Sequence, residues 1–133
     1  MDFIQRKIGN LTGKCITALG LAYKADVDDL RESPAIEVAL LLKGAGAKVI
    51  VFEPYKTNFS IDGISTSMNL KDSVEHADVL VLLVNHQQFR SLVPSEVAKI
   101  THARVVVDTV HGWDRMNWEK AGFKFYRSGD GKN

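Results

Sequence analysis

The segment of residues 20–32 carries two cationic side chains whose types suit an anionic ligand. Lys24 supplies a compact ammonium, and Arg31 supplies a planar guanidinium that can hold a diphosphate in bidentate fashion. Arg31 also lies just before Ser33-Pro34, a pair typical of a helix start, and helix N-termini favour anions. The competing interpretation is that both cations are solvated and balanced by nearby acids, which are Asp26, Asp28, Asp29 and Glu32. That acidic group lacks the spacing of a calcium-binding loop, so we expect no metal site there.

The other residues with reactive side chains are scattered along the chain. Cys15 lies inside an apolar run with no neighbouring histidine, which favours a buried structural thiol over a nucleophile. Of the four histidines, His86 and His111 follow expected strands and are therefore the candidates for a site. Glu53 ends another expected strand, a position that can hold a ribose hydroxyl in nucleotide-binding domains. The sequence contains no Gly-x-Gly-x-x-Gly fingerprint, Walker loop or Gly-x-Ser-x-Gly elbow.

The composition is that of an ordinary globular domain. The chain has 133 residues, of which 45% are hydrophobic and 25% charged, and this length fits one domain. A net charge of +1 gives no basic excess for nucleic-acid binding. The longest apolar run, residues 79–84, is far shorter than the ~18 residues of a membrane span. With one cysteine and no signal-peptide pattern, we expect a reducing, cytoplasmic compartment and neither nucleic-acid nor membrane partners.

Apolar runs and helical segments alternate from residue 14 onward, which is typical of βαβ units. The predicted fold class is α/β, with a three-layer, open, mostly parallel, Rossmann-like sheet in a single domain. Residues 1–13 are interpreted as a polar lead-in. The helix expected to begin at residue 34 is apolar on nearly all sides, which predicts deep burial. Gly44 is expected to adopt the left-handed conformation that caps its C-terminal end. Strands are expected at 15–19, 48–53, 79–84, 104–108 and 123–126, and helices are expected to begin at 34, 70, 87 and 115, with a break near Pro94.

Ligands of such folds bind beyond the carboxyl ends of the strands, where the strand order reverses. The segments of interest therefore follow Leu19, Phe52, Val84 and Val107. The cationic segment of residues 20–32 is the first of these. From the residues alone we expect an α/β domain with an anion-binding edge and no self-contained catalytic apparatus.

Several motifs of the chain are distinctive. They are Leu19-Gly20-Leu21-Ala22-Tyr23-Lys24, Asp28-Asp29-Leu30-Arg31-Glu32-Ser33-Pro34-Ala35, and the runs at 51–55, 77–86 and 106–109. Together they resemble the C-terminal UDP-binding domain of the UDP-glucose/UDP-N-acetylmannosamine dehydrogenase family. The resemblance covers about residues 11–129. It implies a domain over residues 14–133 that binds a UDP-sugar, preceded by a lead-in at 1–13 from a central region outside this sequence. The family also has an N-terminal NAD-binding domain, and its members take part in nucleotide-sugar metabolism and polysaccharide biosynthesis.

The resemblance implies a role in a larger oxidoreductase. Members of the family use NAD to oxidise the C6 alcohol of a UDP-sugar twice, to the uronic acid, through a cysteine of their central region. Neither that cysteine motif nor the NAD fingerprint occurs in this sequence, so we expect the domain to be inactive alone. The resemblance also implies that its parent is a homo-oligomer. The residues of the second motif, at 28–35, favour an N-acetylhexosamine as the sugar, with glucose as the alternative. The alternative is a non-catalytic nucleotide-binding or protein-interaction module with the same fold.

The resemblance also assigns individual residues. Tyr23 and Lys24 match the aromatic–lysine pair of the UDP-sugar site, and Arg31 matches an arginine that reaches the cofactor's pyrophosphate. Relatives usually carry a cation two positions after the aspartate that corresponds to Asp108. Here Val110 stands at that position, unless a one-residue insertion makes His111 its counterpart. The expected substrate-binding residues are therefore Tyr23, Lys24 and His111, the cofactor-binding residue is Arg31, and no catalytic residue or metal ligand is expected.

Overall fold

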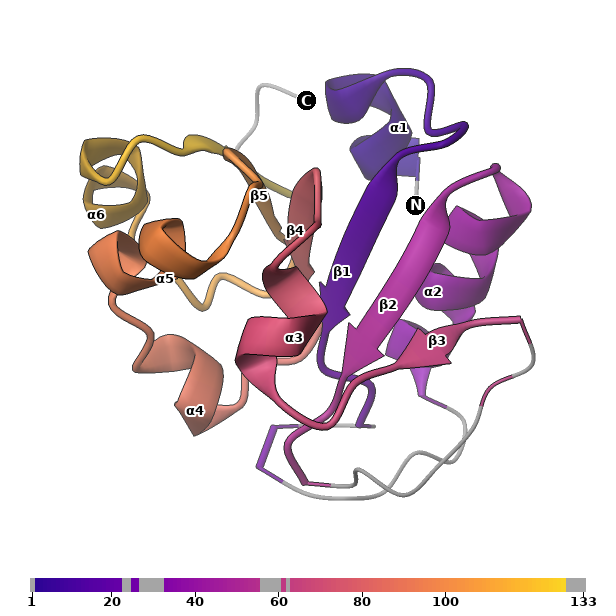
Figure 1. Ribbon diagram of the computed structural model, residues 1–133, viewed down its shortest axis with the longest axis horizontal. Helices are drawn as coiled ribbons and strands as arrows, with labels where there is room; N and C mark the ends of the chain where they lie inside the picture. The colour runs from indigo at the N-terminus through magenta and orange to yellow at the C-terminus, as the bar shows by residue number, and fades with distance from the viewer. Residues whose placement is uncertain (1, 23–24, 27–32, 56–60, 62, 129–133) are drawn as a thin grey trace.

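A six-stranded parallel sheet forms the centre of the computed structural model, which describes residues 2–22, 25–26, 33–55, 61 and 63–128 (Figure 1). The spatial order of the strands is β3-β2-β1-β4-β5-β6, and every neighbouring pair is parallel. The strands are β1 Cys15–Leu19, β2 Lys48–Phe52, β3 Ser65–Thr66, β4 Val79–Leu82, β5 Val105–Asp108 and β6 Lys124–Arg127. This arrangement confirms the predicted α/β, Rossmann-like class.

Helices cover both faces of the sheet and make three layers. They are α1 Asp2–Ile8, α2 Pro34–Gly44, α3 Leu70–Val74, α4 Gln87–Arg90, α5 Pro94–Ile100 and α6 Arg115–Lys120. In Figure 1, α1 and α2 lie on one side of the sheet and α3 to α6 on the other. Successive strand side chains point to opposite faces, so Ile16 and Ala18 join the core under α1 and α2, while Leu19 joins the core under α3 to α6. Burial on both faces explains why the strands are continuous apolar runs.

The strand order reverses between β1 and β4. From β1 the chain proceeds outward to β2 and β3, then returns to β4 on the other side of β1 and proceeds to β5 and β6. Leu19 pairs with both Phe52 and Leu82, and Leu82 pairs with Asp108, so four strands end at the same level. The loops that follow these strands therefore converge on one edge, with the reversal at its centre.

Local capping signals predicted several helix boundaries correctly. The Oγ of Ser33 accepts a hydrogen bond from the N–H of Ala35, and Pro34 occupies the first turn of α2. Asn69 caps α3 through the N–H of Asp72 at 2.8 Å. The predicted break near Pro94 separates α4 from α5. These features depend on residues close together in the chain, which is why the sequence predicts them.

The first residues differ from the predicted polar lead-in, because they form α1 and contribute to the core. Ile4 and Leu11 are 1% and 2% exposed and pack in the same core as Ala39 and Leu42 of α2. Lys7 lies 5.8 Å from the ring centroid of Tyr126. The short edge strand β3 was also not predicted, because its two exposed residues, Ser65 and Thr66, carry no apolar signal.

Three further expectations are corrected. The predicted deep burial of α2 is wrong, since Leu40 and Leu41 are 45% and 47% exposed on the side of the helix that faces away from the sheet. The predicted left-handed cap at Gly44 is also wrong, because α2 runs through Gly44 and the positive φ of +99° falls at Gly46. Cys15 is half-buried rather than buried, because it is the first residue of β1.

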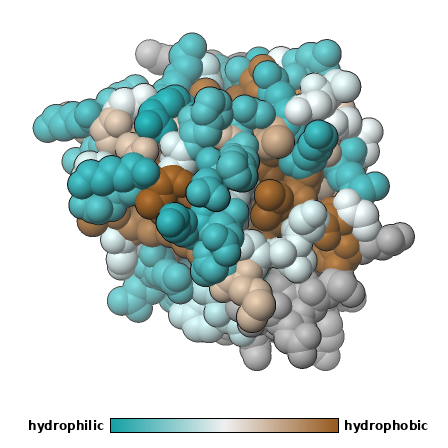
Figure 2. Space-filling view, in the orientation of Figure 1, coloured by the Kyte–Doolittle hydropathy of each residue, from teal (hydrophilic) through white to brown (hydrophobic). Residues whose placement is uncertain are grey.

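Exposed apolar side chains are dispersed rather than gathered in one place. On the face shown in Figure 2, hydrophobic surface lies in patches between hydrophilic residues. Met68 and Met116, among the most exposed apolar residues, lie before α3 and in α6 respectively. None of the helices in the described part of the chain is long and apolar enough to cross a membrane.

The burial of α1 predicts that Ile4 contributes to stability. Ile4→Ala removes a side chain that is 1% exposed and is expected to lower the free energy of unfolding by about 2–5 kcal/mol. Gln5→Ala, on the exposed face of the same helix, serves as the control and is expected to change it by about 0.5 kcal/mol or less. Urea unfolding followed by circular dichroism measures both values. Equal stability of the two variants would show that α1 does not contribute to the core.

Candidate functional site

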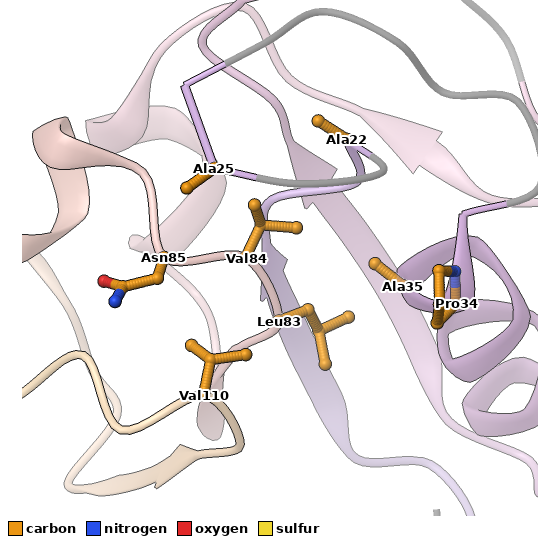
Figure 3. Close-up of a pocket in the computed structure, with 8 residues that line it drawn as sticks. All are labelled: Ala22, Ala25, Pro34, Ala35, Leu83, Val84, Asn85 and Val110. Carbon is orange, nitrogen blue, oxygen red and sulfur yellow. The ribbon is translucent and has the colours of Figure 1, made fainter.

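A cavity of about 330 Å³ lies at the carboxyl edge of the sheet, at the reversal of strand order (Figure 3). This volume is at the lower end of the range typical of small-molecule sites. Residues from three strand ends and one helix start line it: Ala22 and Ala25 after β1, Leu83, Val84 and Asn85 after β4, Val110 after β5, and Pro34 and Ala35 of α2. The topology predicts a ligand at this edge, and the cavity provides the space for one.

Two glycines allow the loops around the cavity to approach closely. Gly20 has a φ of +97°, and a Cβ there would lie 2.6 Å from the Cβ of Val84. A Cβ on Gly112 would lie 2.6 Å from the Oδ1 of Asn85. Contacts this short do not occur in real structures, so another residue at position 20 would force the loops apart, and one at position 112 would displace the side chain of Asn85.

Glu53 connects the end of β2 to the segment that follows β1. Its side chain is fully buried, and its Oε1 accepts hydrogen bonds from the N–H groups of Leu21 at 2.8 Å and Ala22 at 2.9 Å. Its Oε2 accepts one from the N–H of Tyr55 at 2.9 Å. His86 adds a fourth bond, from its Nε2 to Oε1 at 2.9 Å. The carboxylate is therefore fully buried and occupied by protein donors, an arrangement that does not favour the binding of a ribose hydroxyl by Glu53.

His86 connects the same segment to the end of β4. The ring is fully buried, and its Nδ1 lies 2.8 Å from the backbone nitrogen of Asp26. A backbone N–H only donates, so Nδ1 must be the acceptor, and Nε2 carries the proton that is donated to Glu53. This pattern assigns the neutral Nε2–H tautomer to His86. The ring packs between Tyr55 and Phe89, with centroid distances of 4.8 and 5.7 Å.

The carboxylate of Asp26 extends this network to α4. Its Oδ1 accepts hydrogen bonds from the N–H of Gln87 at 2.7 Å and the hydroxyl of Tyr55 at 3.3 Å, and its Oδ2 lies 3.6 Å from a guanidinium nitrogen of Arg90. The pKa of Asp26 is lowered, first by the Gln87 N–H and further by Tyr55 and Arg90, against a smaller opposing effect of burial. Asp26 adopts a positive φ of 61°, which aspartate tolerates better than most residues.

Burial and hydrogen bonding have opposite effects on the pKa of Glu53. Burial raises it and is the largest single contribution. The hydrogen bonds from His86, Leu21 and Tyr55 together outweigh burial, so the pKa lies below the ordinary value of 4.5. Glu53 is therefore an anion at neutral pH, stabilised by the donors around it.

Asp108 shapes the loop after β5 in a similar way. Its buried carboxylate accepts hydrogen bonds from the N–H groups of Val110 at 3.0 Å, Gly112 at 3.2 Å and Trp113 at 2.9 Å. The Nε of Arg127 lies 3.7 Å from the same carboxylate. These bonds fold the loop so that Val110 lines the cavity.

The predicted site residues fall into two groups. Tyr23, Lys24 and Arg31 lie outside the described residues, although Ala22 and Ala25, which flank the first two in the sequence, line the cavity. His111 is exposed, has a φ of +55°, and donates from Nε2 to the carbonyl of Ser128 at 2.9 Å. It is Val110, rather than His111, that is among the residues lining the cavity.

Two polar residues of the site were not identified from the sequence. The apolar pattern predicts only that Asp108 ends a strand. A carboxylate at the carboxyl end of a parallel strand is the signal that indicates a role for Asp108 at this edge of the sheet. Asn85 lines the cavity, and its buried Oδ1 has no hydrogen-bond partner among the described residues. No group of three or more His, Cys, Asp or Glu residues in the described ranges is arranged to hold a metal ion.

Comparison with known proteins places the chain beside nucleotide-sugar dehydrogenases. Residues 17–115 match the UDP binding domain of the UDP-glucose/GDP-mannose dehydrogenase family. The UDP-N-acetyl-D-mannosamine dehydrogenase of Methanocaldococcus jannaschii is 34% identical over 98% of this chain, which spans 31% of that protein. The NDP-N-acetyl-D-galactosaminuronic acid dehydrogenase of Ralstonia solanacearum is also 34% identical, over 85% of this chain and 26% of its own length.

Solved structures agree with this placement. The crystal structure of the NDP-N-acetyl-D-galactosaminuronic acid dehydrogenase of Methanosarcina mazei superposes with a TM-score of 0.81 at 28% identity, covering 92% of this chain and 26% of the other. The native UDP-N-acetyl-mannosamine dehydrogenase of Staphylococcus aureus gives a TM-score of 0.72 at 27% identity, over 97% of this chain and 29% of the other. The chain therefore spans about a third or less of these relatives.

The lowered pKa of Glu53 predicts how stability responds to acid. Above the ordinary value of 4.5 the folded carboxylate contributes its full stabilisation, which is lost as the pH falls through its lower folded pKa. Glu53→Gln is expected to lower the free energy of unfolding by about 1–3 kcal/mol at pH 7. It should also reduce the loss of stability on acidification below that value, because the variant has no carboxylate to protonate.

Urea unfolding at a series of pH values measures both effects. Glu96→Gln removes an exposed carboxylate of α5 and is the matched control, expected to follow the wild-type pH dependence. A Glu53→Gln variant with the full wild-type acid dependence would contradict the assignment of a stabilised anion at Glu53.

Proposed function

Because the chain belongs to the UDP-glucose/GDP-mannose dehydrogenase family, as a member of its UDP binding domain, we propose that it binds a UDP-sugar at the carboxyl edge of its sheet. We propose that it acts as the C-terminal domain of an NAD-dependent dehydrogenase that oxidises the sugar's C6 alcohol to the uronic acid. In this role residues 14–133 form the UDP-sugar-binding unit, and residues 1–13, whose Ile4 and Leu11 pack into its core, connect it to a preceding region. The domain would be inactive without its partners in the full-length protein.

The cavity at the reversal of strand order is the observation that carries this proposal. It lies where doubly wound folds bind nucleotides, and Ala22 and Ala25 on its wall flank Tyr23 and Lys24 in the sequence. The cavity also borders the start of α2, where the helix dipole favours a negative charge. A diphosphate linked to a ring-shaped base and sugar combines the anionic and apolar surfaces that this edge can accommodate.

Different residues are proposed to contact the UDP-sugar and the NAD molecule. Tyr23 and Lys24 are proposed to contact the UDP-sugar, with Lys24 as the cation for the diphosphate. His111 is proposed to take part through the loop that Asp108 folds, in which Val110 already lines the cavity. Arg31 is proposed to reach the pyrophosphate of an NAD molecule held mainly by another domain. NAD dependence, a homo-oligomeric parent and a cytoplasmic setting stay predictions from the sequence.

The sugar is proposed to be an N-acetylhexosamine, with glucose as the alternative. The relatives named UDP-N-acetyl-D-mannosamine dehydrogenase or NDP-N-acetyl-D-galactosaminuronic acid dehydrogenase are 29–38% identical. The UDP-glucose 6-dehydrogenase of Rickettsia typhi is 29% identical over 91% of this chain. These figures favour the N-acetylhexosamine group by a small margin.

Lys24→Met tests the proposed diphosphate contact. One charge-assisted hydrogen bond contributes roughly 1.5–3 kcal/mol, so the dissociation constant for UDP is expected to rise about 10- to 150-fold in calorimetric titrations. Lys48→Met removes the same charge from the start of β2, at the opposite edge of the sheet, and is expected to leave UDP binding unchanged. Equal effects of the two substitutions would exclude a specific contact by Lys24.

The proposal fails if neither this chain nor the full-length protein that contains it binds UDP or a UDP-sugar. The gene sequence upstream of Met1 distinguishes the proposed dehydrogenase from the alternative, a non-catalytic module. A Gly-x-Gly-x-x-Gly domain and a glycine-rich cysteine motif there would support the dehydrogenase, whereas an initiation site at Met1 would support the module.

A further inference from the structure

We propose that Glu53 and His86 act as a pair of positioning residues that hold the chain on either side of Tyr23 and Lys24, at Leu21 and Ala22 before them and at Asp26 after them. The proposal deepens the proposed function and rests on it. Both side chains are 0% exposed, and the Nε2 of His86 lies 2.9 Å from the Oε1 of Glu53. A buried carboxylate beside a buried imidazole is costly unless every polar atom is paired, so this arrangement indicates a specific task.

Glu53 holds the chain before Tyr23, and His86 holds it after Lys24. Glu53 accepts the N–H groups of Leu21 and Ala22, where the chain leaves β1. His86 accepts a hydrogen bond from the N–H of Asp26, whose carboxylate in turn accepts one from the N–H of Gln87 at the start of α4. Tyr23 and Lys24, the residues proposed to contact the UDP-sugar, lie between these two anchors in the sequence.

The two anchors depend on each other through the tautomer of His86. The proton on Nε2 is directed to Glu53, which leaves the Nδ1 lone pair available for the N–H of Asp26. Without an acceptor at position 53, only the N–H of Asp26 still favours the proton on Nε2, so the tautomer with the proton on Nδ1, which cannot accept from Asp26, becomes more populated. A substitution of Glu53 should therefore weaken the hydrogen bond from the N–H of Asp26 to His86, although no hydrogen bond joins Glu53 and Asp26 directly.

Other groups around the ring hold the Asp26 side chain rather than its backbone. The Oδ1 of Asp26 accepts from Gln87 and Tyr55, and Arg90 lies near Oδ2. These contacts do not involve the nitrogen atoms of residue 86, although the Nδ1 of His86 itself lies 3.9 Å from the Oδ1 of Asp26. The backbone N–H of Asp26 therefore reports on His86 specifically, and its hydrogen-exchange rate is a direct measure of the second anchor.

Two substitutions of His86 that differ by one methylene test the pair. His86→Asn places an amide oxygen near the position of Nδ1 and should keep the anchor at Asp26. His86→Gln places its amide near the position of Nε2, so it should keep the bond to Glu53 and lose the anchor. For His86→Gln we expect exchange of the Asp26 amide and the dissociation constant for UDP each to rise about tenfold or more, with His86→Asn within about threefold of wild type.

Glu53→Leu tests the coupling between the anchors. Amide exchange measured by NMR is expected to accelerate about tenfold or more at Leu21, Ala22 and Asp26 in this variant. Thr101→Val is the matched control, because Thr101 is a buried polar residue that bonds to Val74 and Ala103 away from the carboxyl edge. It is expected to lower the melting temperature and leave these three amides and UDP binding unchanged.

The outcomes separate this inference from the proposed function. If the wild-type protein and its full-length parent fail to bind UDP, the proposed function is overturned and the ligand-binding part of this inference with it, while the exchange rates still decide whether the pair holds the segment. If His86→Asn is as impaired as His86→Gln, or if all amides in the protein accelerate equally, the pair has a general structural role and the inference is wrong. Unchanged exchange at Asp26 in Glu53→Leu would overturn the coupling.

Discussion

The buried carboxylate of Glu53 is the interaction on which the arrangement of the cavity depends. It accepts hydrogen bonds from Leu21, Ala22, Tyr55 and His86, which come from the loops after β1, β2 and β4. Removing an anion from water costs several kcal/mol, and the four donors offset this cost only when the three loops have this geometry. The charge therefore selects one loop arrangement. Asp108 performs the same task for the loop after β5.

The sheet topology explains why the polar groups gather at one edge. Parallel strands direct their carboxyl ends to the same side, and the reversal of order between β1 and β4 separates the loops enough to leave a cavity. Glycines at positions 20 and 112 then allow the loops to approach without displacing Val84 or Asn85. The hydrophobic cores on the two faces hold the strands in register beneath this edge.

Family membership and geometry support each other in the proposed role. The chain spans about a third or less of the dehydrogenases that it resembles, so a substrate site here would be completed by segments outside this sequence. The described walls of the cavity contain little chemistry besides the amide of Asn85. A domain that binds and positions a nucleotide, while other regions supply the redox chemistry, is consistent with these features.

The sequence by itself determined the features that arise from neighbouring residues. The alternation of apolar runs and helical segments predicted the α/β class, and Ser33-Pro34 and Asn69 predicted two helix starts, because capping bonds join residues two or three positions apart. The tertiary structure alone decided that Ile4 joins the core and that the carboxylate of Glu53 accepts its hydrogen bonds from protein donors. Glu53 and Leu21 are 32 positions apart, and His86 and Asp26 are 60 apart, so their bonds exist only once the sheet has brought the strand ends together. No local pattern in the chain encodes a contact across such a separation.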